Sequence, residues 1–191
     1  TKASDLLAKE GHTRKEVEIA PGIKVNFVRI PAGRFVMGSY SGEPDAYPTA
    51  RVKIKHGFWM AELETTNEQF NVIFPEHDSR HMDQQWKDHV VPGYPANKPD
   101  QPVIRVSYNQ AMEYCKQLSA KTGLNITLPT EAQWEYACRA GNGGWTYNQN
   151  PPSDTHSQAK ESIKAVAWCS ENWATGTGYD GTSRLHPVGQ K

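Results

Sequence analysis

The chain has 191 residues with 21 basic and 21 acidic side chains, so its formal net charge is zero. This balance, without a basic stripe, argues against nucleic acid or an anionic membrane as a partner. No apolar run approaches the roughly 18 residues that cross a bilayer. Only 37% of the residues are apolar. We therefore expect one domain, or most of a larger one, with short helices and strands joined by long ordered loops.

The N-terminal part of the chain predicts a leader followed by strands. Residues 1–15 are polar and charged, and we expect them to pack loosely against a domain that spans residues 16–191. Apolar and polar residues alternate from residue 16 to residue 27, which predicts two strands, and the Pro21-Gly22 pair between them predicts a turn. Val28 and Ile30 shift the alternation by one position, which predicts a bulge or a strand buried on both faces.

The next elements predicted are a strand and a short helix. Val52 and Ile54 alternate with lysines, as in a strand that has one face in water. Thr65 and Glu68 have the spacing of a capping box, in which each side chain bonds the other residue's backbone N–H at the start of a helix. Pro75 ends this helix early, because proline cannot continue the helical hydrogen-bond ladder.

A second strand and a second helix follow in this prediction. Residues 102–107 are largely apolar and predict a short buried strand. Ser107 and Gln110 form the next capping box, and Gly123 ends the helix. The residues that face the core at helical spacing are Ala111, Tyr114, Cys115 and Leu118.

The last predicted helix begins just after a proline. Thr130 and Gln133 form its capping box, and Gly141 is placed to end it in a left-handed turn. One face of this helix carries three apolar residues at helical spacing, Trp134, Ala137 and Cys138. We therefore expect Trp134, the largest of them, to anchor the core.

The cysteines and the first residue bear on the cellular compartment. Cys115, Cys138 and Cys169 are too few for a disulfide scaffold and lack the spacing of metal ligands. Because their number is odd, at least one is unpaired or bonded to another chain. The chain begins at Thr1, which fits a processed or shortened product, and we expect a secreted or periplasmic protein from which a signal peptide has been removed.

Two candidate metal sites follow from residue types and spacing. His77 and His81 lie at positions i and i+4 and would share one face of a helical turn, where they could chelate a metal; the alternative is a solvated polar loop. Residues 176–182 form a Gly-rich loop that contains Asp180. Glycine allows sharp turns that aim backbone carbonyls inward, which with a carboxylate suits calcium; the alternative is a plain Asp-Gly turn.

Several segments resemble, in order, the motifs of one known family. The most specific is Leu128-Pro-Thr-Glu-Ala-Gln-Trp-Glu-Tyr-Ala-Cys-Arg-Ala-Gly141, and the others begin at Val28, Phe58, Pro102, Ala167 and His186. Together they resemble the formylglycine-generating enzyme family, also called sulfatase-modifying factors, over about residues 27–191. Thr127 and Gln133 stand where that family has Arg and Glu.

The resemblance implies a loop-rich α+β fold, related to C-type lectins, with little regular structure. It also implies that the domain is incomplete in this chain, because the family's paired cysteines, which bind copper and oxidise a substrate cysteine to formylglycine, lie beyond residue 191. Cys115 and Cys138 match cysteines that some members use in structural disulfides. We expect the C-terminal remainder of the domain to be a separate chain that stays associated, which makes the protein a heteromer.

By the same resemblance, the Gly-rich loop binds calcium. Asp180 would give its side chain, Thr182 its backbone carbonyl, and Trp168 a further carbonyl, while Ala167 stands where the family has an Asn ligand. Calcium is therefore the expected metal, and the pair His77 and His81 is the weaker alternative. Copper is expected only if the C-terminal remainder carries the paired cysteines.

Two functions fit this sequence. We favour a binding or assembly module that is not catalytic by itself, because no residue of the chain matches the family's catalytic cysteines. The alternative is the front part of a copper-dependent formylglycine-generating oxidase that acts on a sulfatase cysteine. A third option is a relative of the iron-dependent sulfoxide synthases, which would need His ligands arranged by a further domain.

Overall fold

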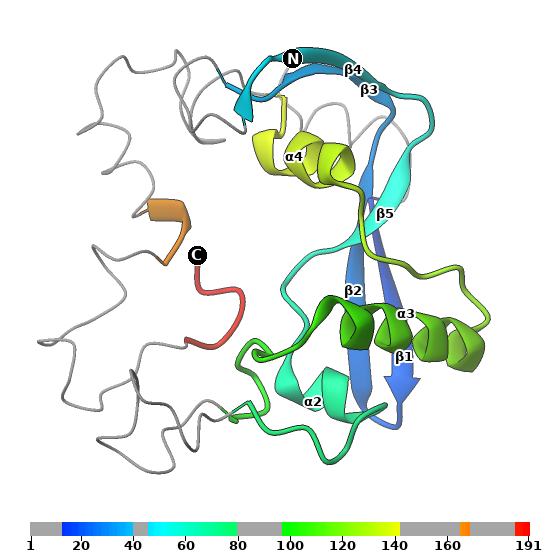
Figure 1. The fold of residues 1–191 in the computed structure, drawn as a ribbon. Coiled ribbons are helices and arrows are strands. Elements are labelled where there is room, and N and C mark those ends of the chain that lie inside the picture. The colour runs from blue at the N-terminus through cyan, green and yellow to red at the C-terminus, as the bar shows by residue number, and fades with distance from the viewer. Residues whose placement is uncertain (1–12, 40–45, 80–96, 142–164, 169–185) are drawn as a thin grey trace, which may run out of the picture. The chain divides into compact units, whose positions relative to one another are not determined.

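The computed structural model describes residues 13–39, 46–79, 97–141, 165–168 and 186–191 (Figure 1). The chain divides into two compact units. The first comprises Thr1–Lys15, Phe27–Met60 and Pro129–Val166, and the second comprises Glu16–Asn26, Ala61–Leu128 and Ala167–Lys191. No described helix is both long and apolar enough to cross a membrane.

A three-stranded sheet has the order β1-β2-β5, with β1 at Arg14–Ala20, β2 at Ile23–Ile30 and β5 at Phe58–Ala61. The predicted turn between β1 and β2 is confirmed, and Gly22 adopts a positive φ of 77° there, which glycine tolerates at little cost. Ile19 and Val25 are buried, as the alternation predicts. All four residues from 27 to 30 are half-buried, which agrees with a strand covered on both faces.

The second sheet is an antiparallel pair of β3, at Gly33–Met37, and β4, at Ala50–Ile54. Its register pairs Phe35 with Val52. Ile54 is buried while Lys53 is exposed, which confirms the predicted strand with one wet face. In the three-stranded sheet, the Arg29 guanidinium of β2 lies over the Trp59 ring of β5, 5.9 Å from its centroid, which makes a cation–π contact.

Helix α2 spans only Asn67–Asn71. Its capping box joins Thr66 and Gln69, so the predicted pair of Thr65 and Glu68 is wrong by one residue. The sequence offers two overlapping boxes, and the one in use places Phe70 inward, where only 2% of its side chain is exposed. The helix ends before Pro75, as predicted.

The predicted strand at residues 102–107 is wrong. Only an isolated bridge between Thr66 and Pro102 forms there. The main-chain groups of Ile104 bond side chains rather than a neighbouring strand. Its N–H donates to Ser79 Oγ at 3.2 Å, and its carbonyl lies 2.9 Å from His77 Nε2. Arg105 then adopts a positive φ of 63°, which breaks the extended conformation that a strand requires.

Helix α3 spans Tyr108–Thr122 and follows the prediction closely. Ser107 and Gln110 form its capping box, and Gly123 ends it in the left-handed conformation. Tyr114, Cys115 and Leu118 are buried, and the Tyr114 ring stacks on Phe70 with centroids 5.0 Å apart. This stack is part of the core of the second unit.

Helix α4 spans Glu131–Arg139, and its predicted capping box between Thr130 and Gln133 is confirmed. The predicted phase of α4, meaning the side of the helix that faces the core, is wrong, because Trp134 is 57% exposed and Cys138 is exposed. The side of α4 that contacts β3 is the one with Glu135, Tyr136 and Arg139, described below. The helix ends at Arg139 with Ala140 as its left-handed cap at φ 48°, and Gly141, the predicted left-handed residue, follows at φ 81°.

The contacts of Tyr136 give the physical reason for this phase. Its ring lies 5.3 Å from that of Phe35, centroid to centroid. Its hydroxyl fills the space that a side chain at Gly33 would occupy. Because Tyr136 fits this gap, the side of α4 that faces β3 lies about 100–200° around the helix from Trp134, at 3.6 residues per turn.

Two substitutions test the assignment of the core. Phe70→Ala should lower the free energy of unfolding by about 3–5 kcal/mol, because the truncated ring is 2% exposed and leaves a cavity. Trp134→Ala, a matched loss of a large ring, should cost less than about 1 kcal/mol, because that ring is 57% exposed. Chemical denaturation measures both. A larger loss for the Trp134 variant would contradict this assignment.

Candidate functional site

His77 lies in a hydrogen-bonded cluster rather than at an open position of the second unit. Its Nε2 lies 2.9 Å from the Ile104 carbonyl and 3.5 Å from Ser79 Oγ, and its ring meets Phe70 edge-on. Ser79 is 1% exposed and donates to Asn67 Oδ1 at 2.6 Å. His81, the predicted second ligand, lies outside the described residues, so the two-histidine metal site stays a prediction.

No sequence pattern indicates this cluster, because Ser79 and Asn67 are polar residues without a periodic pattern. Buried polar groups are nearly always hydrogen-bonded, and both side chains meet that requirement here. The cluster therefore fixes the loop after α2. Among the described residues, no group of three or more His, Cys, Asp or Glu side chains could hold a metal.

Of the three predicted calcium ligands, only Trp168 is described; Asp180 and Thr182 lie outside the described residues. The Trp168 ring stacks on His186, with centroids 3.6 Å apart and planes 12° from parallel. Lys191 Nζ lies 4.6 Å from the same ring, which makes a cation–π contact. The structure thus brings Trp168 together with residues 186–191, the last of the segments that carry the family resemblance.

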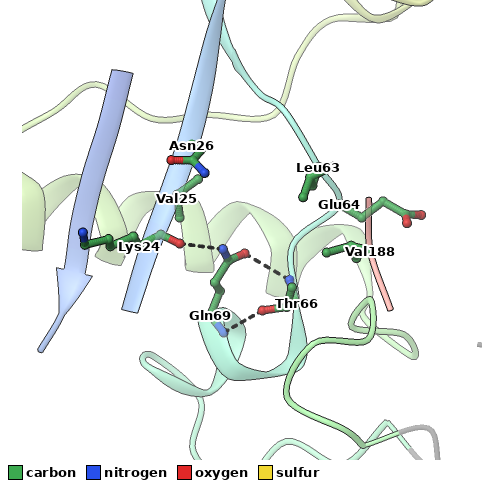
Figure 2. A pocket seen from close by; sticks show the side chains of 8 residues that line it. All are labelled: Lys24, Val25, Asn26, Leu63, Glu64, Thr66, Gln69 and Val188. Atoms are coloured by element: carbon green, nitrogen blue, oxygen red, sulfur yellow. Dashed lines mark hydrogen bonds between the residues drawn. The ribbon is translucent and has the colours of Figure 1, made fainter. Parts of the chain in front are cut away.

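A small cavity lies beside the capping box of α2 (Figure 2). The Gln69 amide spans it: its Oε1 accepts from the Thr66 N–H at 3.1 Å, and its Nε2 donates to the Lys24 carbonyl at 2.8 Å. Val188 lines the cavity, and its N–H donates to the Asp100 carbonyl at 2.9 Å. One side chain therefore connects α2 to β2 next to the docked C-terminal segment.

The size of this cavity limits what it can do. Its volume is about 50 Å³, which holds water-sized molecules but is far below the roughly 300 Å³ of a small-ligand site. Leu63 closes it near Gly189, where an added Cβ would lie 3.2 Å from Leu63 Cδ1. The cavity is therefore a packing feature of the second unit and is too small for a substrate.

The two described thiols have different surroundings. Cys115 is buried in α3, and burial raises the pKa of its thiol, which disfavours the reactive thiolate. Burial likewise raises the pKa of the neighbouring Tyr114 hydroxyl well above its usual value. Cys138 is exposed on α4, and both thiols are free. Cys169 lies outside the described residues.

In the first unit, two charged residues of α4 hold the tight turn after β3. The Gly38 N–H donates to Glu135 Oε1 at 2.9 Å, and Arg139 donates to the Gly38 carbonyl at 2.8 Å. Arg139 also bonds Glu135 at 2.7 Å. Gly38 has a positive φ of 87°, and a Cβ there would lie 2.5 Å from the Ala46 carbonyl oxygen. The sequence signal for this clamp was the i, i+4 spacing of Glu135 and Arg139, which the prediction did not use.

Comparison with known proteins agrees with the sequence motifs. The family model for the sulfatase-modifying factor enzyme 1-like domain matches residues 15–191 of this chain. The formylglycine-generating enzyme of Bos taurus is 39% identical over 92 residues, which are 48% of this chain and 22% of that protein. The enzyme of the same name from Mus musculus is 28% identical over 84% of this chain and 51% of its own length.

Another bovine relative is named inactive C-alpha-formylglycine-generating enzyme 2, and is 26% identical over 73% of this chain and 58% of its own length. The chain thus spans between 22% and 58% of the length of these relatives. Among solved structures, PvdO from Pseudomonas aeruginosa matches with a TM-score of 0.54 and 26% identity, over 66% of this chain and 51% of that one. It shares the mixed strand-and-helix fold.

The bridge made by Gln69 can be tested by a substitution of similar size. Gln69→Met should cost about 1–3 kcal/mol, because it leaves the N–H of the buried Thr66 and the Lys24 carbonyl without their partners. Gln110→Met is the matched control, since within the described ranges the Gln110 side chain bonds one group, the exposed N–H of Ser107 in the capping box of α3. Equal losses of unfolding free energy for the two variants would show that the bridge to β2 adds nothing.

Proposed function

The chain belongs to the sulfatase-modifying factor enzyme 1-like family, and from this premise we propose that it acts as a binding or assembly module. In this proposal the chain forms part of a formylglycine-generating-enzyme-like domain with C-type-lectin-like architecture. Its own residues supply no oxidase chemistry, and the C-terminal remainder of the domain is its partner. We also propose that the protein is secreted or periplasmic.

The observation that carries this proposal is the state of the described thiols. Copper-dependent oxidation of a cysteine needs accessible thiolates that can bind the metal together. Cys115 is buried, and burial raises the pKa of its thiol, so that it is a poor ligand and nucleophile. Cys138 is exposed on α4, and among the described residues it belongs to no group of three or more His, Cys, Asp or Glu side chains that could hold a metal.

The exposed face of α4 supports the binding part of the proposal. Trp134 is 57% exposed on a helix whose opposite side is fixed by Glu135 and Arg139. Tryptophan is one of the residues that most often carry binding energy at protein interfaces. This chain matches only 22–58% of the length of these relatives. We therefore propose that the remainder of the domain covers this face.

The alternative function, the front part of a copper-dependent formylglycine-generating oxidase, is favoured by the bovine and murine relatives that carry the enzyme's name. The murine enzyme at 28% identity and the inactive bovine relative at 26% identity are almost equally similar to this chain. Likeness alone therefore does not separate the two functions, and an activity measurement must.

An aldehyde assay separates them. The chain of residues 1–191 is incubated with copper(I), oxygen, a thiol reductant and a peptide that carries a sulfatase cysteine, and formylglycine is measured by mass spectrometry. We expect no aldehyde above the copper-only control. Aldehyde that disappears in Cys138→Ala but persists in Cys115→Ala would overturn the proposal. The same assay on a polypeptide that continues beyond residue 191 tests the oxidase alternative.

We further propose that calcium binds through Asp180, Thr182 and the carbonyl of Trp168, as the family resemblance implies. An ion that binds only the native state raises its stability by about 2.7 kcal/mol when free calcium is 100 times the dissociation constant. The melting temperature should then rise by several degrees with calcium over chelator, and Asp180→Ala should abolish the difference. Asp100→Ala is the control. Equal melting temperatures of the unsubstituted protein in calcium and in chelator would contradict the proposal.

A further inference from the structure

An open groove in the second unit lies between α2, the turn after β1, the loop before residue 101 and the last turn of α3. Its volume is about 470 Å³, within the range of roughly 300–1,000 Å³ found for small-ligand sites. Ile23, Val72 and Pro99 supply apolar surface to it. None of the predicted metal residues lines it, so it is separate from the sites considered above.

The walls of the groove are held by hydrogen bonds and are therefore preformed. The Glu68 N–H donates to the Pro99 carbonyl at 3.1 Å, which joins the start of α2 to the facing loop. Asn67 adds two more bonds: its N–H donates to the Gln101 carbonyl and its Nδ2 to the Lys98 carbonyl, both at 2.9 Å. A ligand would meet a groove that needs little ordering, which lowers the entropic cost of binding.

Three polar side chains of the groove keep their bonding capacity. Glu68 and Asn71 come from α2, and Lys121 comes from the last turn of α3. All three are exposed, and within the described part of the chain their side chains form no hydrogen bond or ion pair. The groove thus offers one carboxylate, one ammonium and one carboxamide around an apolar surface.

We propose that this groove binds a zwitterionic ligand of the free short-peptide class. The carboxylate of Glu68 takes the terminal ammonium, and the ammonium of Lys121 takes the terminal carboxylate. The Asn71 carboxamide, which has both a donor and an acceptor, pairs with the peptide group. The carboxylate of Glu68 would repel a phosphate or another polyanion, so the groove disfavours such ligands. Its apolar surface accommodates small aliphatic side chains.

The test uses trialanine in three forms: with free termini, N-acetylated and C-amidated. Dissociation constants are measured on the full chain by titration with ligand-observed NMR, without copper or calcium, so the result is independent of the proposed function. Each cap should weaken binding about two- to fivefold, the effect of one solvent-exposed ion pair. Glu68→Gln should bind the free and N-acetylated forms equally, and Lys121→Gln should bind the free and C-amidated forms equally.

Lys116→Gln is the matched control, because Lys116 is an exposed lysine of α3 that pairs with Glu113 and does not line the groove. It should keep both preferences for free termini. Circular dichroism checks that each variant is folded. The proposal is overturned if trialanine shows no binding up to about 5 mM, a free energy weaker than about −3 kcal/mol. Equal affinity of the free and capped forms for the unsubstituted chain also overturns it.

Discussion

The second unit depends on the hydrogen bonds of one side-chain amide, that of Gln69. Helix α2 has five residues, far fewer than a helix needs to be stable on its own in water. Gln69 closes the capping box with Thr66 and also donates to the Lys24 carbonyl of β2. These bonds fix the start and the rotation of α2, and the rotation places Phe70 against Tyr114. The aromatic core follows from this polar constraint.

The first unit is arranged in a similar way, with charged side chains in place of an amide. Glu135 and Arg139 bond the N–H and the carbonyl of Gly38. Where the backbone leaves the sheet and helix ladders, side chains must bond its polar groups. Once α4 is held through Glu135 and Arg139, its apolar side with Trp134 is left exposed. The surface proposed for binding is thus a consequence of the bonds that hold the turn.

The sequence predicts the local signals of this fold better than its packing. The capping boxes of α3 and α4 and the turn at Gly22 were correct, because each depends on two to four neighbouring residues. The phase of α4 was wrong, since it is set by Tyr136 fitting against Gly33, about 100 residues away. Burial of Ser79 could not be predicted either, because its partners are Asn67 of α2 and the main chain of Ile104, 12 and 25 residues away. The groove beside α2 combines four segments and has no sequence motif.

The two thiols show how the same packing bears on function. The apolar spacing of α3 correctly placed Cys115 inside, where burial raises the pKa of its thiol. The same spacing in α4 placed Cys138 inside, yet the clamp at Gly38 turns that thiol outward. In each case the packing of the helix sets its rotation, and this rotation decides whether the thiol is buried or exposed. Family membership alone therefore does not make these thiols copper ligands; for the exposed thiol of Cys138, copper binding would need further ligands beside it.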